Sequence, residues 1–155
     1  MGAVTDESPP LARLFAIAFR TLIDGLHERL AARGWHDVKP TFGFVLLAAR
    51  EAGIQSSEVA ALLGISKQAA SKIVDAMVEA DYVSRSPHPD DQRAKIVTLT
   101  VRGAQLLDDV EQIYAELESE WATIVGGAQI EGMRENLVTV LLATHGGRLP
   151  QVRAT

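Results

Sequence analysis

At 155 residues, with 47% apolar and 23% charged residues, the sequence has the size and composition of a single globular domain. It has no cysteine, no apolar run long enough to span a bilayer and no N-terminal signal region. This excludes disulfides and thiolate metal sites and leads us to expect a cytoplasmic protein with no membrane partner. The net charge of −5 does not exclude nucleic acid, because basic residues gather in the middle of the chain and acidic residues in its last third.

Two helices are predicted in the N-terminal third. Residues 1–10 end at a pair of prolines and are expected to be flexible. Pro40 suits the first turn of the second helix, which is largely apolar and ends at Gly53. The first helix, over residues 11–33, is predicted by apolar residues that recur every three or four positions: Leu11, Leu14, Phe15, Ala18, Leu22, Leu26 and Leu30.

A pair of short helices joined by a tight turn is predicted over residues 56–80. Ser56 or Ser57 can cap the first, and Ser66 can cap the second. The turn between them is short and contains Gly64, which is typical of a helix-turn-helix. The buried stripe of the second helix is predicted to be Ala70, Ile73, Val74 and Met77.

A β-hairpin and two further helices complete the chain. Two β-prone stretches, "YVSRS" and "KIVTLT", flank the turn formers "PHPDDQRA" and predict a hairpin. Thr100 can cap a long helix that ends at Gly126, and a last helix ends near Gly146. The long helix carries an apolar stripe at coiled-coil-like spacing: Leu107, Val110, Tyr114, Leu117, Trp121 and Ile124. Within it we expect a partner subunit to cover Val110, Tyr114, Leu117 and Trp121.

This order of elements resembles the MarR family of winged helix-turn-helix transcriptional regulators. Residues 56–103 carry the resemblance, and the hairpin carries its most specific part. There the family pattern Asp-x-Arg-(Arg/Ala), followed by "LT" and Gly, is matched by Asp91-Gln92-Arg93-Ala94, Leu99-Thr100 and Gly103. The family often has a second arginine where this chain has Gln92, so the hairpin tip is expected to be one positive charge weaker.

The resemblance implies a mainly α fold with a small β-hairpin wing, that is, a winged helix-turn-helix with flanking dimerisation helices. It implies a ligand-responsive repressor, or less often an activator, that acts as a homodimer on a pseudo-palindromic operator in double-stranded DNA, with no enzymatic activity and no cofactor. The apolar surface of the flanking helices, which one subunit cannot cover, supports the homodimer independently. Within a single domain at 11–147, dimerisation helices are expected near 11–33, 104–125 and 129–145, a DNA-binding part near 40–100, and a flexible tail at 148–155.

The predicted DNA contacts fall on the two short helices and the hairpin. Polar side chains that open the second short helix can read base edges, and its lysines can hold phosphates; the alternative is a solvated helix face. Arg93 is expected to enter the minor groove, aimed by hydrogen bonds from its guanidinium group to Asp91, while Lys95 takes a phosphate. The whole set is Ser56, Ser57, Ser66, Lys67, Gln68, Ser71, Lys72, Arg85, Asp91, Arg93 and Lys95.

The resemblance also implies an effector pocket between the dimerisation and DNA-binding parts. Trp35, His36, Phe42 and Phe44 cluster at the junction of the first two helices, and Arg20 can pair with a carboxylate. These residues suit an aromatic acid or a phenol, and the alternative is packing in the dimer core. No histidines stand at metal-ligand spacing, so no metal site is predicted.

The sequence argues against two other classes of function. An enzyme is disfavoured because no Ser/His/Asp order, Gly-rich phosphate loop or carboxylate pair stands out. The remaining alternative is a winged-helix module that binds protein without sequence-specific DNA binding. The basic hairpin tip and the polar face of the second short helix argue against it.

Overall fold

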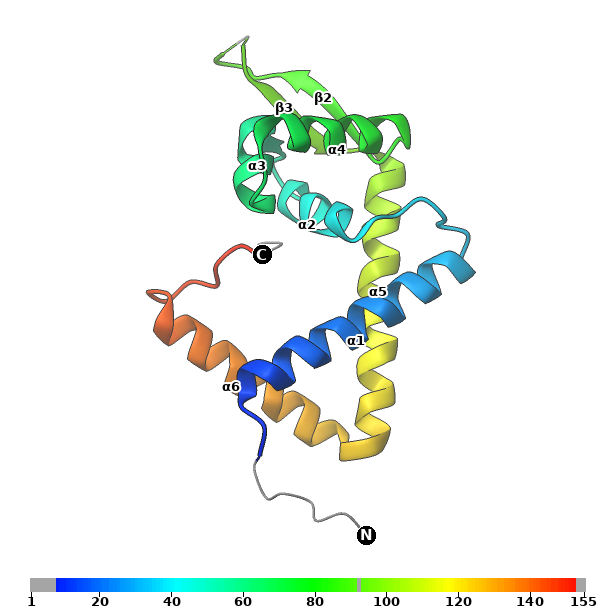
Figure 1. Ribbon diagram of the computed structural model, residues 1–155, viewed down its shortest axis with the longest axis vertical. Helices are drawn as coiled ribbons and strands as arrows, with labels where there is room; N and C mark the ends of the chain where they lie inside the picture. Colours follow the sequence, from blue (N-terminus) through cyan, green and yellow to red (C-terminus); the bar gives the residue numbers. More distant parts are fainter. Residues whose placement is uncertain (1–7, 92, 153–155) are drawn as a thin grey trace.

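The computed structural model describes residues 8–91 and 93–152 as a mainly helical fold with one small sheet (Figure 1). The expectations of flexible ends at 1–7 and 153–155, and of a weaker charge at Gln92, fall outside the described residues. In chain order the elements are α1 (Leu11–Ala32), α2 (Pro40–Ala49), β1 (Ile54–Gln55), α3 (Ser56–Leu63), α4 (Lys67–Glu79), β2 (Val83–Pro87), β3 (Lys95–Leu99), α5 (Val101–Val125) and α6 (Gly127–Thr144).

The long helix α5 is the axis of the molecule. Helices α2, α3 and α4 and the sheet gather around its N-terminal end, and we call this group the winged end (Figure 1). Helix α1 crosses α5, and α6 turns back from the C-terminal end of α5 (Figure 1). No helix in the described part of the chain is apolar over enough length to cross a membrane.

The wing is a three-stranded antiparallel sheet with the strand order β1-β3-β2. Strands β2 and β3 form the predicted hairpin, in which Val83 pairs with Leu99 and Pro87 with Lys95. Strand β1 pairs with the other edge of β3, an addition that the sequence pattern did not predict. Two residues are too few to show the alternation of apolar and polar side chains that marks a strand. The predicted fold class, mainly α with a small β wing, is confirmed with this third strand.

Two of the predicted helix caps are confirmed and one is wrong. The side chains of Ser66 and Thr100 each accept a hydrogen bond from the backbone N–H three residues later, and so cap α4 and α5. The predicted cap of α3 at Ser56 or Ser57 is wrong, because the N-cap is Gln55, without a side-chain bond. Strand β1 runs directly into α3 there, so the chain needs no capping loop.

The core fills the space between the winged end and the N-terminal half of α5. Its fully buried side chains include Phe42, Leu46, Val74, Met77, Tyr82, Val97, Leu106 and Ile113. Tyr82 lies just after α4, and its ring meets that of Phe42 edge-on, with centroids 6.1 Å apart. Helix α5 starts against Tyr82, because the backbone N–H of Thr100 donates to the Tyr82 carbonyl at 3.1 Å. Tyr82 is therefore the residue at which the end of α4, helix α2 and the start of α5 meet.

The apolar stripe predicted along α5 is largely covered within the chain. Val110 and Leu117 are buried, and Leu117 lies against Gly25 of α1. Arginines at the C-terminal end of α1 pair with carboxylates of α5 at Glu116 and Glu120. The expectation that this stripe needs a partner subunit is wrong for Val110 and Leu117. Half of the exposed large apolar side chains in the described part of the chain lie at the start of α1 and along α6: Leu11, Leu14, Phe15, Ile17, Phe19, Met133, Val140 and Leu141.

Candidate nucleic-acid interface and adjoining cavity

Helix α4 buries one face and presents the other to solvent. Ala70, Val74 and Met77 are buried against the core. The polar residues predicted to contact DNA are all exposed: Ser66, Lys67, Gln68, Ser71 and Lys72. An exposed helix face of amide, hydroxyl and ammonium groups carries the donors and acceptors that base edges and phosphates require.

The turn between α3 and α4 fixes how the two helices cross. Gly64 adopts a φ of 66°, a left-handed conformation that side chains with a Cβ rarely take. The backbone N–H of Ile65 then reaches back to the carbonyl of Ala60 at 3.1 Å and closes α3. At the other end of α3, Ser57 is exposed, whereas the hydroxyl of Ser56 is buried without a partner among the described residues. The pair has the geometry of a helix-turn-helix.

Arg85 joins the wing to α4. Its guanidinium group pairs with the carboxylate of Asp75 and donates to the backbone carbonyl of Ser71 at 3.2 Å. These contacts hold strand β2 beside the exposed face of α4. Arg85 was predicted to contact DNA, and two of its five N–H donors are used within the chain instead.

The tip of the wing is ordered by Asp91. Its carboxylate accepts a hydrogen bond from the backbone N–H of Arg93 at 3.0 Å, and its carbonyl accepts one from Ala94 at 3.1 Å. The backbone N–H of His88 closes the loop on the carbonyl of Ala94 at 3.0 Å. The expected bond from the Arg93 guanidinium to Asp91 is thus replaced by a backbone bond. Asp91 shapes the turn that carries Arg93, and the side chain of Arg93 is exposed.

Replacing Asp91 by alanine is expected to weaken DNA binding by about 1 kcal/mol, although it removes a negative charge, because the turn loses its side-chain hydrogen bond. Arg93→Ala is expected to cost about 1–3 kcal/mol, as for a good groove contact. Affinities for a cognate DNA duplex at several salt concentrations measure both effects. Asp90→Ala is the control, since it removes the adjacent charge and leaves the Asp91 bond in place. Tighter binding by Asp91→Ala would show that charge, and not turn geometry, governs this loop.

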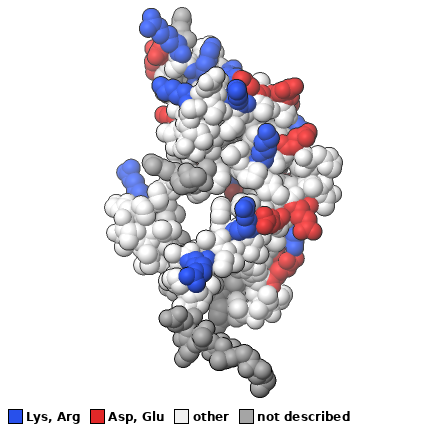
Figure 2. All heavy atoms as spheres, in the orientation of Figure 1, with Lys and Arg blue, Asp and Glu red and all other residues white. Residues whose placement is uncertain are grey.

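Charge is distributed unevenly over the molecule. Figure 2 shows Lys and Arg side chains gathered at the wing tip and over the winged end, with acidic side chains beside them. A mixed band of acidic and basic side chains lies farther from the wing. The ion pairs between α1 and α5, such as that of Arg33 with Glu116, lie far from the wing. Among the described residues, Lys67 and Lys72 on α4 and Lys95 on the wing are exposed and join no ion pair, so α4 and the wing each offer positive groups to an anion.

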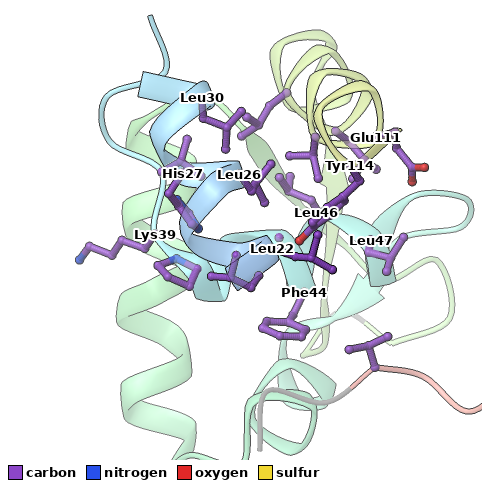
Figure 3. Close-up of a pocket in the computed structure, with 18 of the residues that line it drawn as sticks. Leu22, Leu26, His27, Leu30, Lys39, Phe44, Leu46, Leu47, Glu111 and Tyr114 are labelled. Carbon is purple, nitrogen blue, oxygen red and sulfur yellow. The ribbon is translucent and has the colours of Figure 1, made fainter. Parts of the chain in front are cut away.

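A cavity of ≈ 390 Å³ lies where α1, α2 and α5 meet (Figure 3). Most of its wall is apolar, with Leu22, Leu26, Leu30, Phe44, Leu46 and Val110 among the lining residues. The polar residues at the wall are His27, Lys39, Glu111 and Tyr114. The charged ends of Lys39 and Glu111 point away from the cavity (Figure 3), and Glu111 pairs with Arg50.

Of the residues predicted to form an effector site, Phe44 lines this cavity and the others lie elsewhere. Trp35 is half-buried and Phe42 is buried in the core. Arg20 and His36 are exposed. The structure therefore does not bring Arg20 together with the aromatic residues at this cavity. The connector between α1 and α2 turns Trp35 toward Asp109 of α5 and leaves His36 exposed.

The cavity does hold an imidazole, that of His27. Burial lowers the pKa of His27, and the Asp24 carboxylate and a hydrogen bond to the Val38 carbonyl partly offset this. Burial also raises the pKa of the Tyr114 phenol, and the nearby charge of Glu111 adds to the shift. Both side chains are consequently neutral near pH 7, and each offers a hydrogen bond to a molecule in an otherwise apolar space.

His27 makes folding stability depend on pH. Because its pKa is lowered in the folded chain, the unfolded chain binds more protons as the pH falls below the ordinary value of about 6.5, so the folded state loses stability on acidification. We expect the melting temperature to fall between about pH 7.5 and pH 5.5, and to fall less in His27→Gln. Thermal melts of both proteins measure this. An equal fall in the two would assign the pH dependence to other groups.

A polar recognition helix beside a β wing, set on helices with a shared cavity, defines a winged helix-turn-helix DNA-binding protein. A family model described as "MarR family" matches residues 37–94. MarR from E. coli, in its wild-type apo form, is 26% identical and superimposes with a TM-score of 0.72 over 87% of this chain and 99% of that chain. Its reduced form gives 26% identity and a TM-score of 0.74 over 88% and 99%.

A mutant of MepR from S. aureus, bound to an oligodeoxyribonucleotide, shares the fold at 19% identity, with a TM-score of 0.60 over 89% of this chain and 100% of that chain. No curated protein sequence matches the chain. Residues 37–94 of the chain therefore match the MarR family of winged helix-turn-helix, DNA-binding transcriptional regulators, a non-enzymatic family, and most of the chain shares the fold of E. coli MarR.

Proposed function

We propose that the protein is a ligand-responsive repressor that acts in the cytoplasm and binds a pseudo-palindromic operator as a homodimer. The observation that carries the proposal is the exposed polar face of α4 beside the wing, with Gln68, Ser71 and Lys72 directed to solvent. The MepR structure, which shares this fold, holds an oligodeoxyribonucleotide, and this supports DNA as the partner. Each protomer would place α4 in the major groove and the tip of its wing in the minor groove.

Exposed apolar side chains support the homodimer. Leu14 and Phe15 on α1 are 43% and 45% exposed, and Val140 on α6 is 58% exposed. Apolar side chains gathered on the helices farthest from the wing mark a protein–protein interface. A second copy of the chain is the proposed occupant, because two-fold symmetry then presents two α4 helices to two half-sites about 34 Å apart.

The position of the cavity supports ligand responsiveness. Its walls come from α1 and α5, which lie outside the winged end along much of their length, and from α2, which belongs to it. A bound molecule would favour one angle between these parts over another, and a shift of a few ångströms is enough to misplace one α4 helix on its half-site. The proposed effect of the ligand is therefore release of the operator.

The chemistry of the wall favours a neutral phenol over an aromatic carboxylate. Arg20, the predicted carboxylate partner, does not line the cavity, and the Lys39 amine points away from it (Figure 3). A buried carboxylate without a cation would be costly, whereas a phenol can exchange hydrogen bonds with His27 and Tyr114. The cavity volume of ≈ 390 Å³ is within the range of small-molecule sites.

Alkylphenols are expected to raise the melting temperature and weaken operator binding, and benzoates of the same size to do so less. Tyr114→Phe keeps the cavity and removes one hydroxyl, so it should lower phenol affinity by about fivefold. Titrations followed by thermal shift and by operator affinity measure these effects. A phenol series that leaves both quantities unchanged in the wild type would contradict the proposed effector class.

Selection of binding sites from a random DNA duplex library tests the DNA-binding proposal. The wild type should enrich a pseudo-palindrome, and a Gln68→Ala, Ser71→Ala double variant should enrich a different or degenerate site. Lys72→Ala is the matched control: it should weaken binding to all sequences and reduce the salt slope by about one, as expected for a phosphate contact. Unchanged selectivity in the double variant would remove the base-reading role. A folded wild type that enriches no sequence would favour the protein-binding alternative.

A further inference from the structure

Arg102, in the first turn of α5, touches parts of the chain that are far apart in sequence. Its guanidinium carbon lies 4.9 Å from the centre of the Trp35 ring and 5.3 Å from that of Tyr82. Its Nε donates a hydrogen bond to the backbone carbonyl of Ala80 at 3.3 Å. A guanidinium group at these distances from two aromatic rings makes favourable cation–π contacts. We call this cluster of Arg102, Trp35, Tyr82 and Ala80 the Arg102 junction.

The Trp35 side of the junction is anchored to both α1 and α5. The backbone N–H of Trp35 donates to the carbonyl of Leu30 at 2.9 Å, and its indole N–H donates to the carboxylate of Asp109 at 2.7 Å. Arg33 pairs with the same carboxylate at 3.5 Å. Trp35 is therefore held in place by Leu30 of α1 and by Asp109, farther along α5, in addition to its contact with Arg102.

The opposite side of the junction is the end of α4. Ala80 is the C-cap of that helix, and Tyr82, two residues later, leads into β2. The buried Tyr82 ring lies 6.0 Å from the Trp35 ring. A cation at the C-terminal end of α4 also complements the helix dipole. Arg102 thus joins the end of the DNA-facing helix to the connector between α1 and α2.

We infer that Arg102 is a positioning residue for DNA binding, which fixes the angle between α4 and the rest of the subunit and so aligns the two α4 helices of a dimer with their half-sites. This inference rests on the proposed operator-binding function. The Arg102 junction also connects the cavity to α4 through a series of contacts. Leu30 and Val38, on either side of Trp35 in the chain, line the cavity, so a ligand that moves them acts on Trp35 and, through Arg102, on the end of α4.

A direct contact between Arg102 and a phosphate is the competing explanation, and the two make opposite predictions for Arg102→Lys. Lysine keeps the charge that a phosphate needs, but it lacks the planar group that stacks on Trp35 and Tyr82 and the fixed Nε donor. Loss of a positioning residue leaves the salt slope and non-specific binding unchanged. Loss of a phosphate contact lowers both.

The test uses the full chain and the duplex that the wild type enriches from the random library. Arg102→Lys and Arg102→Met should each weaken binding to this duplex by about fivefold or more, with the wild-type salt slope and the wild-type affinity for unrelated DNA. Adding one base pair between the half-sites of the duplex should lower the affinity of the wild type. It should lower the affinity of the two variants by a smaller factor. Arg29→Met, which removes ion pairs between α1 and α5, is the control and should bind like the wild type.

A spectroscopic measurement tests the junction without an operator. In a Trp121→Phe background, Trp35 is the remaining tryptophan of the two in the sequence. Its emission should change on Arg102→Met, and the selected duplex should shift it in the background protein but not in Arg102→Met. Wild-type affinity of Arg102→Lys, or a lowered salt slope in Arg102→Met, would overturn the inference. If the wild type enriches no duplex, the proposed function fails, while unaltered Trp35 emission in Arg102→Met separately refutes the junction.

Discussion

Replacing Leu14 and Phe15 together by glutamate is expected to convert a dimer into a monomer and to weaken operator binding about 100-fold or more. Both side chains lie on the exposed part of α1, and burying each apolar side chain of this size contributes about 1.5–3 kcal/mol. In a two-fold dimer each substitution occurs twice, so the interface gains four buried charges and loses four apolar side chains. A monomer engages one half-site and loses the gain from simultaneous binding of two.

Sedimentation at micromolar concentration and titration of the operator duplex measure the two effects. Leu14→Met with Phe15→Leu is the matched control, because it keeps the face apolar and should leave the dimer and its affinity intact. Both residues are exposed within the subunit, so the glutamates should not unfold it, and circular dichroism checks this. A glutamate variant that sediments as a monomer and still binds the operator with wild-type affinity would refute the dimeric mode of binding.

Gly103→Ala is expected to destabilise the fold by about 3 kcal/mol, at the upper end for overpacking. A Cβ on Gly103 would lie 1.9 Å from the carbonyl oxygen of Tyr82, where no atom fits. Relief requires the first turn of α5 to move away from Tyr82, which breaks the hydrogen bond from the Thr100 N–H to that carbonyl and strains the bond from the Thr100 hydroxyl to Asp81. Gly103 ends the "LTxxG" sequence, and this contact explains why a glycine stands there.

Urea unfolding at a fixed protein concentration measures the loss. Gly127→Ala is the control, because nothing lies within 4 Å of a Cβ at that position in the first turn of α6. It should leave stability unchanged or raise it by a few tenths of a kcal/mol. Equal unfolding midpoints for Gly103→Ala and the wild type would show that α5 does not approach Tyr82 this closely.

Local chemistry explains which elements the sequence could predict. Ser66 and Thr100 are hydroxyl residues placed immediately before helical patterns, so their capping roles could be recognised from short-range spacing. Strand β1 exists only because β3 offers it an edge, and pairing with a residue some forty positions away leaves no local pattern. The partner of the α5 stripe was misassigned for a related reason: apolar spacing shows that a face is covered, but not by which helix.

The cavity shows the same limit. His27 stands four residues after Ile23 and three before Leu30, the spacing of one helix face, so its burial could have been anticipated. The sequence favours His36 because it lies next to aromatic residues, and Arg20 because it could pair with a carboxylate. Neither property shows where the side chain points in the folded chain. At the wing tip, the pairing of Asp91 with Arg93 was predicted from their spacing, but the bond goes to the backbone N–H of Arg93. Sequence spacing alone does not show whether the backbone N–H or the guanidinium group of Arg93 donates to Asp91.

Mapping the genomic fragments that the protein retains from sheared DNA of its own source tests the central claim most directly. A dimeric operator-binding regulator should retain a small set of fragments that share one pseudo-palindrome, with half-sites centred about 10 base pairs apart, and two chains should bind each site. The same experiment with Gln68→Ala, Ser71→Ala should lose these fragments while keeping weak, salt-sensitive retention of bulk DNA. Uniform retention of all fragments by the wild type, or none, would contradict sequence-specific operator binding.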